Sequence, residues 1–141
     1  MPMTIHVDIV SAEGAIHSGT AAMVYATAEL GEVGIAPRHT AFISRLKPGD
    51  VRVENEAGEQ EHFYVSGGMI EVQPMVVTVL ADTAIRARDL DEAAAMEAKR
   101  RAEDALAGHT AEFEYAKAQA ELAEAIAQLR AIEKLRKMKR G

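Results

Sequence analysis

The segment "MVVTVLADTAIRARDLDEAAAMEAKRRAE", residues 75–103, contains the change of pattern that decides the fold. Its first eight residues are rich in β-branched side chains, which predicts a strand. From about Ile85 onward the chain is rich in Ala, Glu, Lys and Arg, which are strong helix formers. We therefore predict a β domain over residues 1–84 and a helical region over residues 85–141, with a hinge at residues 85–89.

Upstream of this segment the chain reads as short strands separated by turns. In "TIHVDIV", residues 4–10, apolar and polar side chains alternate with the period of a half-buried strand. Pro48 and Gly49 in "LKPGD" predict a type II turn, and residues 56–58 predict a hairpin. Pro74 is expected at a strand end or edge. Short strands with frequent turns favour a sandwich or a barrel.

Downstream, the helical region divides into two helices. Asp89 is the predicted N-cap of the first helix, Gly108 marks its end, and Thr110 is the predicted cap of the second. Alanines recur at steps of three and four on both: Ala95, Ala98, Ala102 and Ala105, then Ala116, Ala120, Ala123, Ala127 and Ala131. Facing alanine stripes predict a closely packed antiparallel hairpin. Alanines bury little apolar area, so we expect this hairpin to detach from its docking surface.

Composition and charge exclude several classes of protein. The chain has 141 residues and no cysteine, so disulfides, thiolate nucleophiles and Cys-based zinc sites are excluded. Residues 1–84 hold 4 Lys/Arg against 11 Asp/Glu, a net of −7, which argues against nucleic-acid binding. Residues 130–141 hold 6 Lys/Arg against Glu133, a net of +5. This basic end either contacts an acidic surface or complements the helix dipole.

A search for catalytic or ligand-binding motifs is largely negative. Gly14 and Gly19 have the separation of a phosphate-binding loop, but Thr20 stands in place of the lysine. The five histidines show no metal-ligand spacing, so no metal site is predicted. Glu32 and His39, with Arg38, form the only candidate acid/base cluster, and no nucleophile–base pair can be argued. The residues therefore favour an interaction or regulatory subunit over an enzyme.

Five collinear stretches resemble the ε subunit of bacterial F-type ATP synthases. They are "GEVGIAPRH" (31–39), "LKPGDVRV" (46–53), "FYVSGGMIEVQPMVVTVLADTA" (63–84), "DLDEAAAMEAKRRAE" (89–103) and "AELAEAIAQLRAIE" (120–133). The resemblance implies a β-sandwich of about ten strands followed by a two-helix hairpin. It also implies a non-catalytic rotor subunit that links the γ subunit to the c-ring and couples proton flow to ATP synthesis. Its C-terminal helices are expected to inhibit ATP hydrolysis.

The resemblance also assigns partners to residues. Contact with the c-ring is implied for a loop around Glu32 that holds Gly31, Glu32 and Val33. Contact with γ is implied for Ser11, His39 and Ser44. When the helices extend, the residues implied to reach the α and β subunits are Lys134, Arg136 and Lys137. The protein would then lie peripherally on the cytoplasmic face of the bacterial inner membrane, held there through the complex. The alternative function is a free-standing ligand-binding β module whose helices dimerise.

Two positions depart from the family pattern. Arg38 stands where relatives often have glycine before the histidine. In members that bind ATP, the motif I/L-D-x-x-R-A contributes an arginine, and here Ala94 occupies its place. Asp91 and Arg101 remain as a possible weak nucleotide site. The guanidinium of an arginine is a strong hydrogen-bond donor to phosphate. Its absence at position 94 therefore predicts weak or absent ATP binding and no cofactor.

Overall fold

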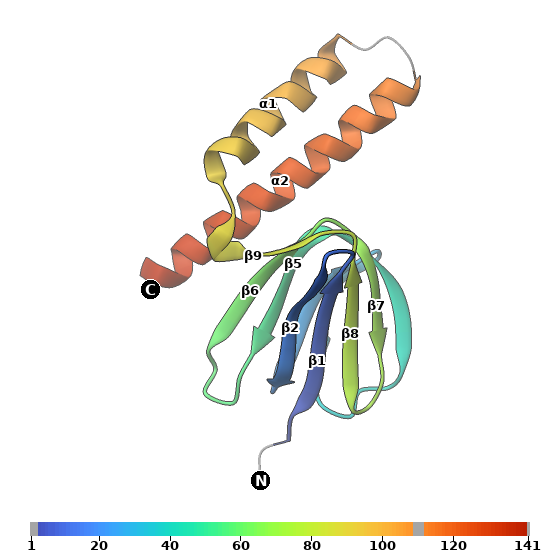
Figure 1. Cartoon of the computed structure of the whole chain (residues 1–141), viewed down its shortest axis with the longest axis vertical. Coiled ribbons are helices and arrows are strands. Elements are labelled where there is room, and N and C mark those ends of the chain that lie inside the picture. The colour runs from blue at the N-terminus through green and yellow to red at the C-terminus, as the bar shows by residue number, and fades with distance from the viewer. Residues whose placement is uncertain (1–2, 109–111, 141) are drawn as a thin grey trace.

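The computed structural model describes residues 3–108 and 112–140, with side chains for 3–108 and 115–137. The described residues form a β-sandwich with a two-helix hairpin across one end, as predicted (Figure 1). The strands are β1 (Ile5–Ser11), β2 (Gly14–Ala21), β3 (Met23–Ala28), β4 (Gly31–Ile35), β5 (Phe42–Glu54), β6 (Gln60–Val65), β7 (Gly68–Val72), β8 (Val76–Ala81) and β9 (Ala84–Arg86). They are followed by a short 3-10 helix, η1 (Ala87–Asp89), and by α1 (Glu92–Ala107) and α2 (Glu112–Arg140). Nine strands are thus found in the described residues, against the ten or so implied by the resemblance.

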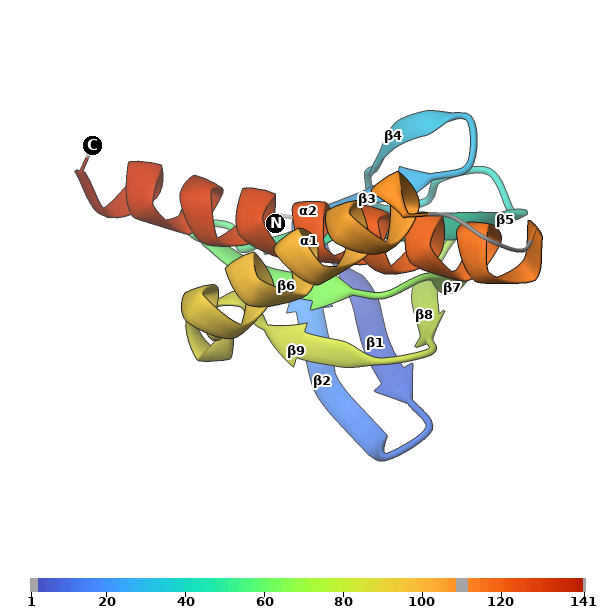
Figure 2. The same cartoon turned by 90° about the horizontal axis from the view of Figure 1, so that it is seen from above.

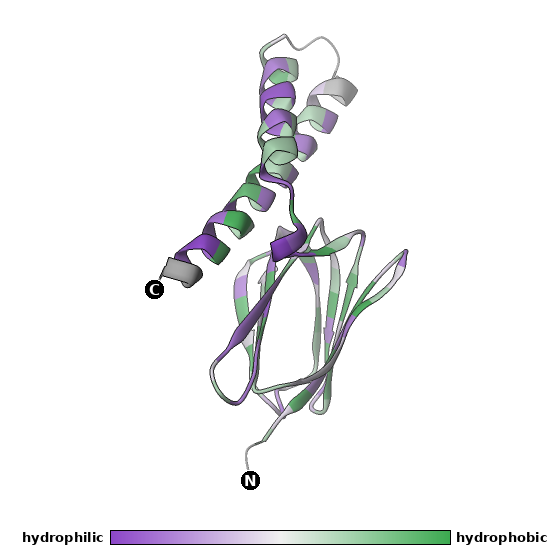
Figure 3. Ribbon diagram, turned by 60° about the vertical axis from the view of Figure 1, so that its left-hand side comes forward, coloured by the Kyte–Doolittle hydropathy of each residue, from purple (hydrophilic) through white to green (hydrophobic). Residues whose placement is uncertain are grey.

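The core lies between two layers that share one long strand. One layer runs β2-β1-β8-β7-β5, and β5 continues into the other, where it pairs with β3 and β6. Hydrophobic and hydrophilic residues alternate along the strands (Figure 3). The inward residues of β1, which are Ile5, Val7 and Ile9, are almost fully buried, as the alternation in residues 4–10 predicts.

The predicted turn at Pro48 and Gly49 is wrong, because both residues lie inside β5. Residues 42–46 of this strand pair with β7, and residues 49–54 pair with β6. Between these two stretches the pairing of β3 with β5 shifts register. Proline lacks an N–H to donate and is tolerated at such an irregularity. The Pro-Gly pair therefore marks the bend at which β5 passes from one layer to the other.

The start of α1 also differs from the prediction. Its N-cap is Asp91, whose carboxylate accepts a hydrogen bond from the Ala94 N–H at 3.1 Å, while Asp89 ends η1. The helix ends at Gly108, as expected. Ile85 and Arg86, in the predicted hinge, belong to β9, which pairs with β6. The predicted cap Thr110 lies outside the described residues.

Both predicted alanine stripes are only partly correct. In α1, Ala95 and Ala102 are buried and Ala98 is half-buried, but Ala105 is exposed. In α2, the predicted Ala127 and Ala131 are buried, together with Ala118 and Ala125, whereas Ala116, Ala120 and Ala123 are exposed. Ala127 and Ala131 pack against the sandwich, where α2 contacts β5, β6 and η1 (Figures 1 and 2). The second helix therefore serves two interfaces, because α1 occupies only one of its sides.

Among the helices that the structure describes, none has the length and hydropathy needed to cross a bilayer.

Candidate functional site

Tyr64 is the centre of the contact between the hairpin and the sandwich. Its neighbours in β6, Phe63 and Val65, point into the core, so its own ring points outward. The ring is nevertheless fully buried, packed with Ala127, Ala131 and Leu90. Burial, and then the nearby Glu124 charge, raise the pKa of the Tyr64 hydroxyl, which therefore stays protonated. Tyr64 is thus the sandwich side chain around which the buried apolar cluster between the sandwich and α2 is built.

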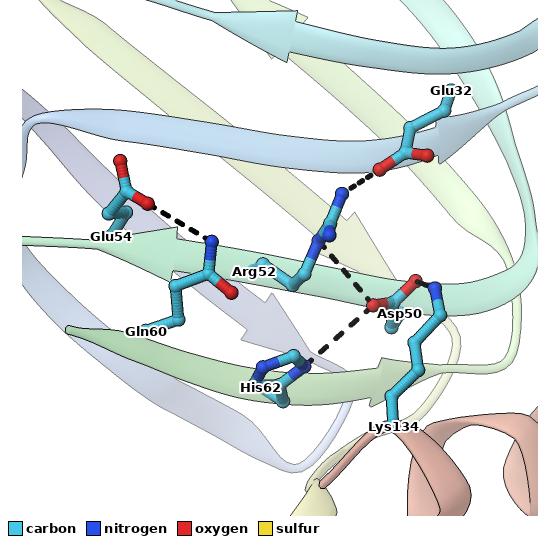
Figure 4. A network of polar contacts seen from close by, with 7 residues as sticks. All are labelled: Glu32, Asp50, Arg52, Glu54, Gln60, His62 and Lys134. Atoms are coloured by element: carbon cyan, nitrogen blue, oxygen red, sulfur yellow. Dashed lines mark hydrogen bonds and ion pairs between the residues drawn. The ribbon is translucent and has the colours of Figure 1, made fainter. Parts of the chain in front are cut away.

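A network of charged side chains lies beside this ring (Figure 4). Asp50 in β5 is only 7% exposed, and its Oδ1 accepts a hydrogen bond from Lys134 Nζ of α2 at 3.1 Å. Its Oδ2 lies 3.7 Å from Arg52 Nε and 3.8 Å from His62 Nδ1. A buried charge costs free energy unless it is paired, so Asp50 depends on the Lys134 and Arg52 cations beside it.

The pKa of Asp50 reflects this balance. Burial raises it, but the contacts with His62 and Lys134 outweigh burial and hold the pKa of the carboxyl below its ordinary value. A carboxyl whose pKa falls on folding stabilises the fold at neutral pH, and this contribution is lost as the pH falls through the folded value. Asp50 is therefore ionised, and attached to the hairpin, at physiological pH.

Arg52 extends the network across the sheet to β4. It forms a close ion pair with Glu32, and its guanidinium lies 4.7 Å from the centre of the Tyr25 ring. Stacking on an aromatic ring restrains a guanidinium in addition to its ion pairs. Arg52 thus lies between two carboxylates, Glu32 on β4 and Asp50 on its own strand.

A cleft of about 570 Å³ lies between α2 and the bend of β5. Its floor is largely apolar, with Pro48, Ile126 and Ala127 among its lining residues. Lys47 and Arg130 add positive charge to its wall. Among the described residues, no group of three or more His, Asp or Glu side chains is arranged to hold a metal ion.

The residues predicted to contact the c-ring lie in a strand rather than in a loop. Gly31, Glu32 and Val33 belong to β4 and pair with residues 26–28 of β3. The tip of this hairpin is instead formed by Glu29 and Leu30, and Leu30 is fully exposed. The β4 hairpin projects from one side of the sandwich (Figure 2).

The residues predicted to contact γ are spread over three segments. Ser11 ends β1, where its hydroxyl donates to the Gly14 carbonyl at 3.4 Å. His39 Nδ1 donates to the Thr40 carbonyl at 2.8 Å, and the Ser44 hydroxyl donates to the Arg45 carbonyl at 3.0 Å. Two strands, β8 and β7, separate β1 from β5, which amounts to about 14 Å at 4.8 Å per strand. The structure therefore does not gather these residues into one cluster.

The outer face of the same layer carries exposed apolar side chains. Ile43 of β5 is 64% exposed and Leu80 of β8 is 50% exposed. Leu80 pairs with Val10 of β1 on one side and with Met69 of β7 on the other. These four side chains, Val10, Ile43, Met69 and Leu80, form what we term the outer apolar face. The sequence pattern does not reveal it, because isolated apolar residues on outward positions are common.

The possible nucleotide residues are also apart. Asp91 is engaged as the helix cap, and Arg101 is exposed and lies 3.7 Å from Glu97. Ten residues of helix separate them, which is about 15 Å at 1.5 Å per residue. The three residues implied to reach the α and β subunits have acidic partners within the chain: Lys134 donates to Asp50, Arg136 pairs with Glu92, and Lys137 pairs with Glu133.

The candidate acid/base cluster is not supported by the contacts of its members. Glu32 pairs with Arg52, and His39 contacts the Thr40 carbonyl. The backbone N–H of Arg38 donates to the Pro74 carbonyl at 2.9 Å. Arg38 has a φ of 65°, a left-handed conformation that costs a non-glycine residue about 1–2 kcal/mol. This conformation is the physical reason that glycine suits the position before His39.

Comparisons with known proteins cover nearly the whole chain. The family model for the β-sandwich domain of the ATP synthase delta/epsilon chain matches residues 4–87, and the model for its long α-helix domain matches residues 88–133. The ATP synthase epsilon chain of Nitrosococcus oceani is 65% identical over 137 residues, which is 97% of this chain and 98% of that protein. The ATP synthase epsilon chain of Thioalkalivibrio sulfidiphilus is 66% identical over 138 residues, with the same coverage.

Solved structures share the fold at lower identity. A chain from the cryo-EM structure of the Euglena gracilis mitochondrial ATP synthase superposes with a TM-score of 0.83 at 22% identity. The match covers 94% of this chain and 83% of that one. A chain from the central stalk and c-ring of the Tetrahymena thermophila enzyme superposes with a TM-score of 0.60 at 12% identity, covering 92% and 97%.

Proposed function

Because this chain belongs to the ε-subunit family of ATP synthases, we propose that it links the γ subunit to the c-ring and couples proton flow to ATP synthesis. The relationship over 97% of the chain carries this proposal, since it includes both the sandwich and the hairpin. As an ε chain it is a rotor-stalk component and is not catalytic by itself. It would lie on the cytoplasmic face of the bacterial inner membrane, attached only through the complex.

Two surfaces of the sandwich suit the two rotor partners. The outer apolar face offers Ile43 and Leu80 to γ, with Ser11, His39 and Ser44 on or near the same layer. Contiguous exposed apolar patches mark protein-binding surfaces, and in this face Val10, Leu80 and Met69 are neighbours in register. The projecting β4 hairpin offers Leu30 at its tip, together with Gly31, Glu32 and Val33, to the polar loops of the c-ring.

Reconstitution with purified γ and c-ring tests the proposal. We expect the wild-type protein to associate with them, and Ile43→Asp to weaken binding to γ because it buries a charge in the interface. Met96→Asp is the matched control, since Met96 is 57% exposed but lies on α1. Absence of association by the wild type would reject the assignment. A stable dimer without affinity for γ would instead support a ligand-binding module with a dimerising hairpin.

We also propose that the hairpin inhibits ATP hydrolysis when it leaves the sandwich. Its docking depends on Tyr64 and a few ion pairs, so a detached packing needs only a few new contacts to match the docked one in free energy. The acidic partners of Lys134, Arg136 and Lys137 could be exchanged for acidic groups of the α and β subunits. With Ala94 in place of the arginine, we propose that this occurs without bound ATP or another cofactor.

Removal of the residues from 88 onward tests the inhibitory role. We expect coupled ATP synthesis to persist, because both rotor surfaces lie in the sandwich, and ATP hydrolysis by the assembled complex to rise. The measurement is the hydrolysis rate of complexes rebuilt with the full-length and the shortened chain. An unchanged rate would mean that the hairpin is not an inhibitor.

A further inference from the structure

Four charged residues connect the docked hairpin to β4, a strand at the end of the sheet order. In order they are Lys134 on α2, Asp50 and Arg52 on β5, and Glu32 on β4 (Figure 4). No ion pair joins Lys134 to Glu32 directly. Lys134 pairs with Asp50, Asp50 also lies beside Arg52, and Arg52 pairs with Glu32. The helix that is proposed to leave and the strand that is proposed to meet the rotor are therefore joined through Asp50 and Arg52.

Arg52 is the shared member of this series. Its terminal nitrogen Nη2 pairs with Glu32, while its Nε lies 3.7 Å from Asp50 Oδ2, longer than a good hydrogen bond. Asp50 accepts its shortest contact from Lys134, at 3.1 Å. With the helix docked, Lys134 thus supplies the cation that pairs with buried Asp50, and Arg52 remains paired with Glu32.

We propose that the position of the hairpin controls whether Glu32 is paired, through competition between Asp50 and Glu32 for Arg52. When α2 leaves, Asp50 loses Lys134, and the Arg52 guanidinium, whose Nε already lies 3.7 Å from Asp50 Oδ2, turns from Glu32 toward Asp50 to replace that cation. Glu32, whose side chain is half exposed, then becomes a free carboxylate on the β4 hairpin. It is then available to a cationic group of a partner.

The coupling must act in both directions. If release of Lys134 weakens the pair between Arg52 and Glu32, then neutralising Glu32 must weaken the docking of the helix by the same factor. Physically, an Arg52 without Glu32 moves toward Asp50 and competes with Lys134. Among the described side chains the ion pair of Glu32 is with Arg52 on β5 and not with a residue of α2, so a purely local role for Glu32 would leave docking unchanged. This inference rests on the proposed detachment of the hairpin, but it can be measured on the isolated chain.

The absence of cysteine makes hairpin opening measurable. Ala127→Cys places a single thiol in the contact with Tyr64, where the native residue is 9% exposed. Its labelling rate by a thiol reagent reports how often the hairpin opens. We expect Glu32→Gln to raise this rate by about threefold. Glu13→Gln, an exposed carboxylate of the same sandwich outside the series, is the matched control and should leave the rate unchanged.

The Arg52→Gln background decides between competition and a general effect of charge. With Arg52 absent, Glu32→Gln should no longer accelerate labelling, while circular dichroism checks that each variant remains folded. Equal rates for Glu32→Gln and Glu13→Gln would overturn the proposal, and so would acceleration that persists in Arg52→Gln. Failure of the proposed function would appear separately, as absent binding to γ and the c-ring with the labelling result unaffected.

Discussion

Gly68→Ala is expected to destabilise the isolated protein by about 3 kcal/mol or more, a large part of a typical stability of about 5–15 kcal/mol. Gly68 begins β7 with a φ of +140°, a region that side chains rarely occupy. A Cβ there would lie 2.1 Å from the Leu80 carbonyl oxygen and 2.9 Å from the Ala81 Cα. Because both obstacles are backbone atoms of β8, relief requires the two paired strands to separate.

Gly14→Ala separates the clash from the backbone strain. Gly14 has a φ of +131°, close to that of Gly68, but a Cβ there would have no neighbour within 4 Å. Its substitution should therefore cost only the strain, about 1–3 kcal/mol. Urea unfolding of the two variants and the wild type provides the comparison. If Gly68→Ala proves no more destabilising than Gly14→Ala, the close approach of β7 and β8 is not as described.

Tyr64→Ala is expected to release the hairpin while the sandwich stays folded. Removing a buried aromatic ring costs about 3–5 kcal/mol in a core, and this ring is the largest apolar group between the two parts. Its loss leaves the sandwich core intact, because Tyr64 points away from the core toward Ala127 and Ala131. The distance between spin labels on exposed residues, placed by Ala57→Cys and Gln119→Cys, should change from a narrow to a broad distribution.

Tyr64→Phe is the control for the hydroxyl. The Tyr64 hydroxyl donates to the Glu124 carbonyl at 3.5 Å, a long hydrogen bond, so its removal should cost less than about 1 kcal/mol. We expect the label distances in Tyr64→Phe to match those of the wild type. Narrow distances in Tyr64→Ala would contradict the central role of the ring and would assign docking to the ion pairs instead.

The family and the order of elements could be predicted from the sequence alone. Strand periodicity over residues 4–10 and helix-forming composition after Ile85 are local properties, and both describe what the structure contains. The five matching stretches led to the ε family, which the family models and the identities above 60% confirm. Such stretches are informative because they occur in the same order across nearly the whole chain.

The incorrect predictions share a physical cause. A local sequence pattern does not show which strands the segment will pair with in the folded protein. Pro48 and Gly49 favour a turn in isolation, but pairing with β3, β6 and β7 holds β5 extended through them. The segment around Glu32 was expected to be a loop, but its pairing with β3 makes it a strand. Residues 63–65 are all apolar, without the apolar–polar alternation of a half-buried strand. This pattern indicates that β6 is covered on both faces.

A strand-forming half followed by a helix-forming half is encoded locally, since both preferences depend on residues close together in the chain. Which side of α2 meets the sandwich depends instead on tertiary packing, and this packing buries Tyr64. The same packing brings Lys134 to Asp50, 84 positions earlier in the chain. Pairing of this kind depends on how the elements pack, and no periodicity within either segment encodes it.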